Sequence, residues 1–142
     1  MNRTSIRSGL VLLVLGAVAW GSGCASSIAL EPGAKTPAAA GSMKLARDSQ
    51  GNTKVALTVD YLPEPNQLDR SLTTFVVWSI ADDGSRVRNM GQLQVDSHRH
   101  GAVNLVTPLT KFRIVVTAEE NGTTEKPSDY VILHGNVQMN QS

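Results

Sequence analysis

The sequence predicts an all-β domain that follows an N-terminal leader. From residue 42 onward, short runs rich in Val, Ile, Leu and Thr recur, and clusters of Gly, Pro, Asp and Asn separate them about every ten residues. Several of these runs alternate apolar and polar side chains, as half-buried strands do. No stretch shows the apolar periodicity of an amphipathic helix. These observations predict many short strands joined by turns.

The first three expected strands differ in how strongly the sequence marks them. Residues 42–47 are expected to form the first strand, at the edge of a sheet. Residues 54–62 alternate, which gives that strand one apolar face. Residues 74–80 are the most apolar run of the domain, and the Asp82-Asp83-Gly84 turn signal ends it.

Four further strands complete the expected set. In residues 86–95, Gly91 is expected at a bulge or at a close approach of two backbones. Residues 102–106 form a short strand, and residues 111–119 alternate again. Residues 130–137 close the domain.

Seven strands in roughly a hundred residues are typical of a seven-stranded antiparallel immunoglobulin-like β-sandwich, here over residues 42–138. A small closed barrel is the alternative. The third strand carries Trp78, where such sandwiches often bury a tryptophan. The cysteine pair of antibody domains is missing, so the likeness concerns architecture alone. The expected core side chains are Trp78, Phe75, Phe112, Ile114 and Val116.

Residues 1–23 have the features of a secretory signal peptide. Arg3 and Arg7 form a basic start, residues 10–20 are apolar, and small residues end the segment at Gly23. The apolar run is shorter than the roughly 20 residues that a membrane-spanning helix needs. The pattern predicts export and cleavage between Gly23 and Cys24, with an uncleaved anchor as the alternative.

Cys24 is the only cysteine of the chain, so it has no partner for an internal disulfide. A cysteine directly after small residues resembles the lipobox of bacterial lipoproteins. That resemblance implies a thiol carrying a diacylglyceryl group, and hence a membrane anchor of the palmitate type. Gly21 departs from the lipobox, where an aliphatic residue is usual, and Ala25 resembles an outer-membrane address. The alternative is a free or intermolecular thiol.

Residues 24–41 consist largely of Ala, Ser, Gly, Pro and Thr. Such a segment buries too little apolar surface to offset its ordering entropy, so a disordered tether is expected between anchor and domain. Residues 139–142 are expected to form a polar tail. The chain has 13 Lys and Arg against 12 Asp and Glu and no basic cluster, so nucleic acid is not an expected partner.

Two segments of the domain carry motifs known together from one family. Phe75-Val76-Val77-Trp78-Ser79-Ile80 is followed by Asp83-Gly84 and by Met90-Gly91-Gln92-Leu93. Farther on, Ile114-Val115-Val116-Thr117-Ala118-Glu119 precedes Gly122, Pro127, Val131 and Gly135. Over residues 75–135 the chain thus resembles the C-terminal domain of anti-sigma-K factors, which implies an extracytoplasmic β-sandwich. The family's sigma-binding helices have no counterpart here, so its sigma-sequestering activity is not implied.

The sharpest chemical motif is Asp96-x-His98-x-His100. On a strand, these side chains would share one face and could ligate zinc or copper. The alternative is a polar hairpin loop, which the neighbouring Arg99 and the lack of a further ligand cluster favour.

Other polar and aromatic residues are better explained by the fold. His134 is expected to be a half-buried strand residue, and Trp78 a core residue rather than a stacking platform for a sugar or peptide. The carboxylate pairs Asp82-Asp83 and Glu119-Glu120 are expected to be solvated. No nucleophile elbow or phosphate-binding glycine pattern occurs, so the chain is not expected to be an enzyme or to need a cofactor.

The sequence therefore predicts an exported, lipid-anchored protein of the bacterial cell envelope, on the outer membrane or the periplasmic face. Its expected role is that of a non-catalytic binding or structural module. The expected partners are the membrane, through the lipid, and another envelope protein, and no small-molecule substrate is inferred. The alternatives are an accessory subunit that pairs through a strand edge such as 42–47, a secreted enzyme with a loop-assembled site, and a metal-binding protein.

Overall fold

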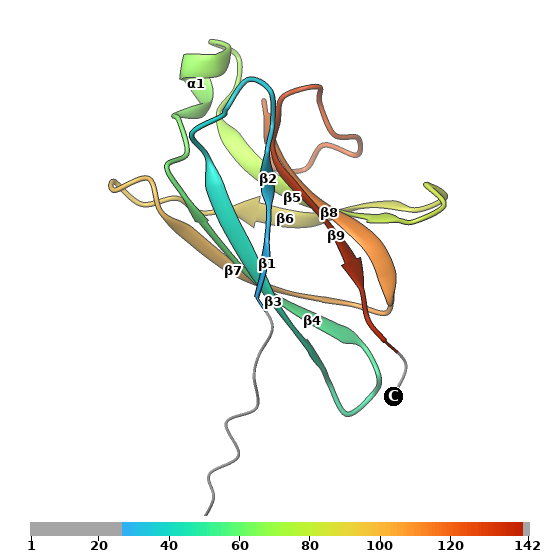
Figure 1. The fold of residues 1–142 in the computed structure, drawn as a ribbon. Helices are drawn as coiled ribbons and strands as arrows, with labels where there is room; N and C mark the ends of the chain where they lie inside the picture. The colour runs from blue at the N-terminus through green and yellow to red at the C-terminus, as the bar shows by residue number, and fades with distance from the viewer. Residues whose placement is uncertain (1–26, 141–142) are drawn as a thin grey trace, which may run out of the picture.

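The computed structural model describes residues 27–140 (Figure 1). The predicted signal peptide, its cleavage at Gly23 and Cys24, and the lipid attachment at Cys24 lie outside the described residues. Within them the chain forms nine strands and one helical turn, and the all-β prediction is confirmed. No helix among residues 27–140 is long and apolar enough to cross a membrane.

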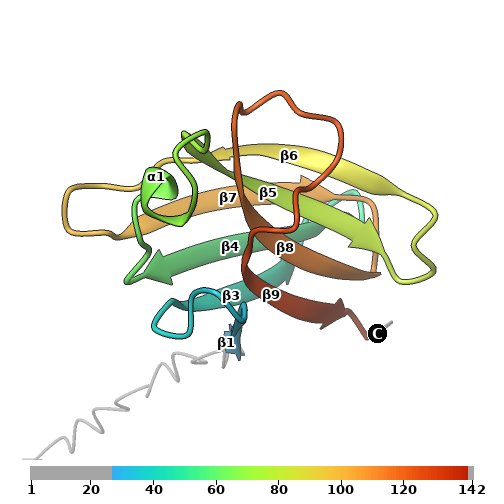
Figure 2. The ribbon, with the colours of Figure 1, turned by 90° about the horizontal axis from the view of Figure 1, so that it is seen from above.

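The strands form two antiparallel sheets (Figures 1 and 2). The four-stranded sheet has the order β1 (Ser27–Ala29), β3 (Ala40–Arg47), β4 (Thr53–Asp60), β7 (Gly101–Thr107). The five-stranded sheet has the order β2 (Glu31–Pro32), β9 (Val131–Gln138), β8 (Lys111–Glu119), β5 (Thr74–Ala81), β6 (Val87–Leu93). The single turn of helix, α1 (Pro65–Leu68), lies between β4 and β5 in the chain. The expected strand count of seven is wrong: each expected run forms one strand, and β1 and β2 are additional.

The two sheets enclose one shared core. Val55, Leu57 and Val59 of β4 belong to the same cluster as Phe75 of β5 and Ile114 of β8. Burying side chains of this size contributes about 1.5–3 kcal/mol each. The expected core positions Phe75, Phe112, Ile114 and Val116 are all buried here, as predicted.

Trp78 is fully buried, but on the other face of its sheet. Because Phe75 and Val77 point into the shared core, alternation along β5 directs Val76 and Trp78 outward. There they form a second apolar cluster with Val115 of β8. Burial on both faces explains why residues 74–80 are the most apolar run of the domain. Trp78 is thus a buried residue, as expected, and it belongs to this second cluster rather than to the one between the sheets.

The segment expected as a disordered tether is structured from Ser27 onward. β1 pairs with β3 and β2 pairs with β9, so consecutive residues join both sheets. Leu30, between them, is only 6% exposed. A Cβ added at Gly135 would lie 2.5 Å from Leu30 Cδ2, so the glycine leaves the space that this leucine fills. Strand pairing and the burial of Leu30, Thr36 and Ala39 thus order a segment whose composition predicts disorder.

The expected edge position of residues 42–47 is also corrected. β1 covers Ser42–Lys44, and only Leu45–Arg47 are left without a neighbour on that side.

The expected bulge at Gly91 is confirmed, since the register between β5 and β6 shifts beside it and its φ is 114°. The expected polar tail begins as part of the domain, because the Met139 amide donates to Thr110 O at 2.8 Å.

Replacing Leu30 by Ala tests whether this segment belongs to the domain. We expect the free energy of unfolding to fall by about 2–4 kcal/mol, because the substitution leaves a cavity between Gly41 and Gly135. Chemical denaturation followed by circular dichroism measures the change. The exposed Ala38→Ser serves as control, and equal stability of the two variants would mean that the segment is a tether after all.

Candidate functional site

Loops gather at one end of the domain, at the top of Figure 1. They are the β2–β3 connection, the β4–β5 connection with α1, and the β8–β9 loop, with the β6–β7 hairpin beside them (Figures 1 and 2). We call this region the loop end. Because loops on a rigid scaffold commonly carry binding residues, it is the first place to look for a site.

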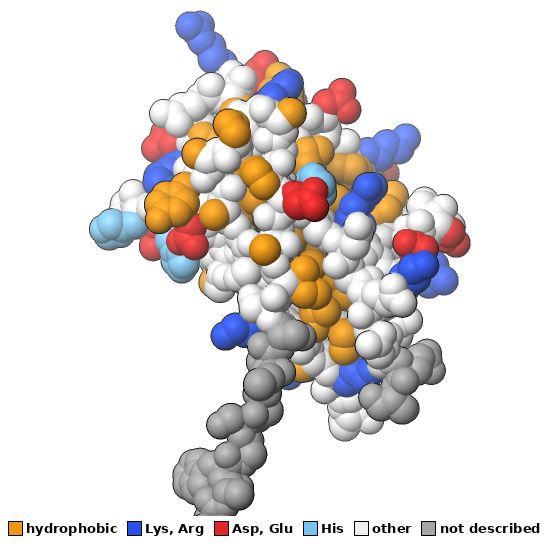
Figure 3. Space-filling model, viewed as in Figure 1, with side chains coloured by type: hydrophobic (Ala, Val, Ile, Leu, Met, Phe, Trp, Pro, Cys, Tyr) orange, Lys and Arg blue, Asp and Glu red, His pale blue; other side chains and the backbone are white. Residues whose placement is uncertain are grey.

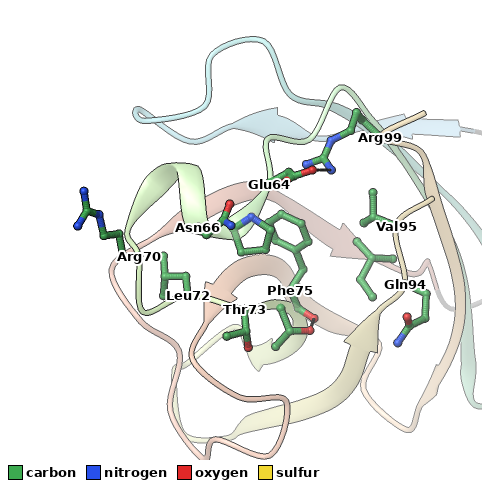
Figure 4. A pocket seen from close by; sticks show the side chains of 12 residues that line it. Glu64, Asn66, Arg70, Leu72, Thr73, Phe75, Gln94, Val95 and Arg99 are labelled. Carbon is green, nitrogen blue, oxygen red and sulfur yellow. Dashed lines mark hydrogen bonds and ion pairs between the residues drawn. The ribbon is translucent and has the colours of Figure 1, made fainter. Parts of the chain in front are cut away.

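A cavity of about 490 Å³ opens at the loop end between α1 and the β6–β7 hairpin (Figure 4). Its wall is apolar where Leu72, Phe75 and Leu93 contribute. Glu64 and Arg99 meet at its rim, as the dashed line in Figure 4 marks. The cavity therefore combines an apolar wall with a charged rim, which is the usual make-up of a ligand site.

Arg99 is the most unusual residue of the loop end. Its Nε donates to Leu62 O at 2.7 Å, and its Nη1 lies 3.4 Å from Glu64 Oε1. Its Nη2 is the one buried side-chain nitrogen or oxygen in residues 27–140 that has no hydrogen-bond partner. A buried donor without a partner is costly, so Arg99 offers a hydrogen bond that a bound carboxylate or carbonyl could accept.

A second cavity at the loop end has a volume of about 300 Å³. The β2–β3 connection, Tyr61 and Leu68 line it, and Arg99 lines both cavities. Tyr61 is 72% exposed, which is high for an aromatic side chain. The loop end thus joins an exposed aromatic ring and a partly buried guanidinium on one surface.

Backbone strain is concentrated at the same place. Tyr61 and Arg99 have φ values of 59° and 67°, and they are the two non-glycine residues with positive φ in the described chain. The Leu62 amide donates to Arg99 O at 3.4 Å, so the two strained positions are neighbours. Such strain costs free energy and persists where the surroundings hold it, often at binding sites.

The β4–β5 connection holds Glu64 in position. The Gln67 side chain accepts a hydrogen bond from the Glu64 amide at 3.0 Å, and Pro65 starts the helical turn. In this arrangement the Glu64 carboxylate lies beside Arg99. The rim of the cavity therefore consists of Glu64, which the β4–β5 connection positions, and Arg99, which comes from the β6–β7 hairpin.

A buried chain of polar groups fixes the β8–β9 loop over the outer face of β5. Trp78 Nε1 donates to Thr117 Oγ1 at 2.8 Å, and Thr117 Oγ1 donates to Glu119 Oε1 at 2.5 Å. The Ser128 amide donates to the same Glu119 oxygen at 2.7 Å. Glu119 is 5% exposed, so the expectation that it is a solvated strand-end charge is wrong.

The same loop is hydrogen-bonded to the wall of the cavity of about 490 Å³. The Thr73 amide donates to Glu119 O at 2.9 Å, and Thr73 Oγ1 donates to Glu120 O at 2.7 Å. Because Thr73 lines the cavity, the polar chain below Trp78 also holds part of the loop end.

The structure does not bring Asp96, His98 and His100 together as ligands. The three residues lie in a turn, where Asp96 Oδ1 accepts hydrogen bonds from the backbone amides of His98 and His100, at 2.9 and 3.0 Å. The His100 ring faces Asp60 instead. Within residues 27–140, no group of three or more His, Cys, Asp or Glu residues is placed to hold a metal. Strand alternation does not apply here, because the strand ends before Asp96.

The remaining candidates lie away from the loop-end cavities. His134 is half-buried on the outer face of β9, and its Nε2 lies 3.9 Å from Glu31 Oε2. Asp82 pairs with Lys111 at 2.8 Å. On the face seen in Figure 3, charged side chains of both signs are scattered without a large basic cluster.

The pKa of His100 is raised above its ordinary value of 6.5, because the ring hydrogen-bonds to Asp60 and the carboxylate charge favours the protonated form. This pair therefore stabilises the fold fully below the unfolded-state pKa, and its contribution is lost as the pH rises through the folded-state value. Both groups are exposed, so the effect on stability is small.

We expect an NMR titration to give His100 a pKa above 6.5, and Asp60→Asn to lower it. Asp82→Asn is the matched control, because Asp82 pairs with Lys111 and not with a histidine. If Asp60→Asn leaves the His100 titration unchanged, the pair does not form in solution.

Sequence reasoning missed the residues that define this site. Arg99 and Tyr61 carry no local motif, and their importance comes from backbone conformation and distant neighbours. A scan against models of protein families finds no match for the chain, and a search among curated proteins finds no relative.

Proposed function

We propose that this protein is an exported protein of the bacterial cell envelope, anchored by a lipid at Cys24, and that its domain is a non-catalytic module that binds another envelope protein at the loop end. The observation that carries the binding role is Arg99, whose buried Nη2 has no partner although the same guanidinium lines two cavities. The export signal and the sole cysteine support the location. The resemblance of residues 75–135 to an extracytoplasmic domain supports it as well.

We further propose that the fold is an immunoglobulin-like sandwich extended by two short strands. In support, removing β1 and β2 leaves the orders β3-β4-β7 and β9-β8-β5-β6, with seven strands in two facing sheets. Such sandwiches often present their binding loops at one end. The loop end of this chain would then correspond to a binding end.

The anchor would hold the domain near the bilayer. Three peptide steps separate Cys24 from Ser27, where β1 begins, and they span at most about 11 Å. β1 joins the sheet opposite Lys44, away from the loop end (Figure 1). A lipid at Cys24 would thus leave the loop end free for a partner.

The make-up of the loop end indicates a peptide-like ligand. An exposed tyrosine, apolar walls and an arginine donor together suit a protein segment whose carbonyl or carboxylate oxygen accepts from Arg99. Arg99 and Glu64 compensate each other's charge, so a strongly charged ligand is not favoured.

Affinity capture from the native membrane, with mass spectrometry of the eluate, tests the binding role. We expect the full chain to retain a stoichiometric partner that Arg99→Asn loses, since asparagine tolerates positive φ but lacks the guanidinium. Arg86→Asn is the matched control, because Arg86 is exposed in the β5–β6 turn. Equal capture by both variants, or no partner with either, would contradict the proposal.

The anchor is tested separately. Cys24→Ser should release the chain from the membrane fraction. A chain that stays membrane-bound and is processed at the same bond would refute lipid attachment while leaving the loop-end proposal intact.

A further inference from the structure

β7 is an open edge of the four-stranded sheet. It is the last strand in that sheet and pairs with β4 over Gly101–Thr107. Its other side makes one isolated bridge, between Gly101 and Val95. Beyond that bridge, no strand among the described residues covers Ala102–Thr107 on this side.

The other sheet edges are short or protected. β1 has three residues and β2 has two. β6 carries the bulge at Gly91, and Asn89 Nδ2 on it donates to Gly122 O at 3.0 Å and to Thr124 O at 2.9 Å. The β8–β9 loop is therefore hydrogen-bonded to β6 and hinders another strand from pairing along that edge.

β7 lacks every such protection. Its sequence, Gly-Ala-Val-Asn-Leu-Val-Thr, contains no charge and no proline, and its register with β4 is unbroken. Natural edge strands usually carry a charge, a proline or a bulge that prevents pairing with another chain. Val106 is 53% exposed on this strand, one of the few exposed large apolar side chains in residues 27–140.

We propose that β7 pairs antiparallel with β7 of a second copy of this chain, about a twofold axis at Asn104. The strand is complementary to itself in that register: Ala102 lies opposite Val106 of the second copy, and Val103 lies opposite Leu105. No charged residue meets a like charge across the axis, because none occurs from Gly101 to Thr107. Such a twofold contact closes on itself and yields a dimer rather than a fibre.

The pairing joins the two four-stranded sheets into one continuous sheet. It supplies partners to backbone groups of Ala102–Val106 on the open side and covers Val106. A partner strand from another protein is the competing occupant. The self-complementary, uncharged sequence favours a second copy, since a strand selected for a different protein would carry side chains matched to that protein.

This inference goes beyond the proposed function and does not depend on it. No residue from Ala102 to Thr107 lines either loop-end cavity, and the pairing requires no lipid at Cys24. Loss of the dimer and loss of the loop-end partner are therefore separate results.

Sedimentation of the exported chain carrying Cys24→Ser tests the dimer. We expect a concentration-dependent monomer–dimer equilibrium, and Asn104→Lys should raise its dissociation constant at least about tenfold by placing like charges at the axis. Ala46→Lys is the matched control, an exposed position on β3 away from the β7 edge. A chain that stays monomeric up to about 1 mM, or equal weakening by both variants, would overturn the inference.

Cross-linking tests the register. With Cys24→Ser as background, Asn104→Cys should form a disulfide-linked dimer under mild oxidation, because directly opposed Cβ atoms of antiparallel strands lie about 4.5–5.5 Å apart. Ala46→Cys should stay monomeric. If Ala46→Cys cross-links and Asn104→Cys does not, the two copies do not pair through β7 about Asn104, even if a dimer forms.

Discussion

Trp78→Ala is expected to lower the free energy of unfolding by about 3–5 kcal/mol. The indole is fully buried between Val76, Val115 and the β8–β9 loop, so truncation leaves a large cavity on the outer face of β5. It also removes the donor to Thr117 Oγ1. For a domain of this size, such a loss is a large part of the total stability. Urea denaturation followed by circular dichroism measures the change.

Two further variants separate the contributions at Trp78. Trp78→Phe keeps an aromatic ring but loses the hydrogen bond, so it should cost about 1–2 kcal/mol. Tyr61→Ala is the control, since Tyr61 is exposed and its truncation should change stability by less than about 0.5 kcal/mol. If Trp78→Ala destabilises no more than Tyr61→Ala, the β8–β9 loop does not cover the indole in solution.

The strands of this domain were predictable because their signals are local. β8 begins at Lys111 and ends at Glu119, as its alternation predicts. β5 is bounded by the turn signal after Ala81, and Gly91 marks a real bulge. In each case, neighbouring residues alone decide between strand and turn.

β1 and β2 were not predictable from the same kind of signal. Composition indicates disorder there, whereas order comes from pairing with β3 and β9 and from Leu30, which fills the space beside Gly41 and Gly135. Gly41 lies in β3 and Gly135 lies in β9, so the two glycines belong to different sheets, and Gly135 is far from Leu30 along the chain. No local pattern reports that such a space exists.

The sequence pattern also does not predict which face of a sheet packs against the second sheet. Alternation along β5 correctly puts Trp78 on the face opposite Phe75, but it does not say which face meets the second sheet. Glu119 shows the same limit: its parity predicts a side chain away from the core, and only the fold of the β8–β9 loop buries it. Arg99 depends on tertiary structure, because a turn conformation and two residues distant in sequence, Leu62 and Glu64, define its role.

Glu119→Ala is expected to lower the free energy of unfolding by about 2–4 kcal/mol and to loosen the β8–β9 loop. Glu119 Oε1 accepts from both Thr117 Oγ1 and the Ser128 amide, so truncation leaves two donors without an acceptor. The Ser128 amide should then exchange with solvent much faster than in the native chain. Denaturation and native-state hydrogen exchange measure the two effects.

Glu119→Gln separates the hydrogen bonds from the charge. The amide oxygen can accept from the same two donors, so this variant should retain slow exchange at Ser128 and lose less stability than Glu119→Ala. Glu120→Ala is the matched control, because Glu120 is exposed and contributes its backbone oxygen, not its carboxylate, to Thr73. Fast Ser128 exchange in the glutamine variant would mean that the loop requires the negative charge itself. Unchanged exchange in Glu119→Ala would show that Glu119 does not hold the loop. Since Thr73 connects that loop to the cavity of about 490 Å³, a loosened loop in Glu119→Ala should also weaken partner capture at the loop end without touching Arg99.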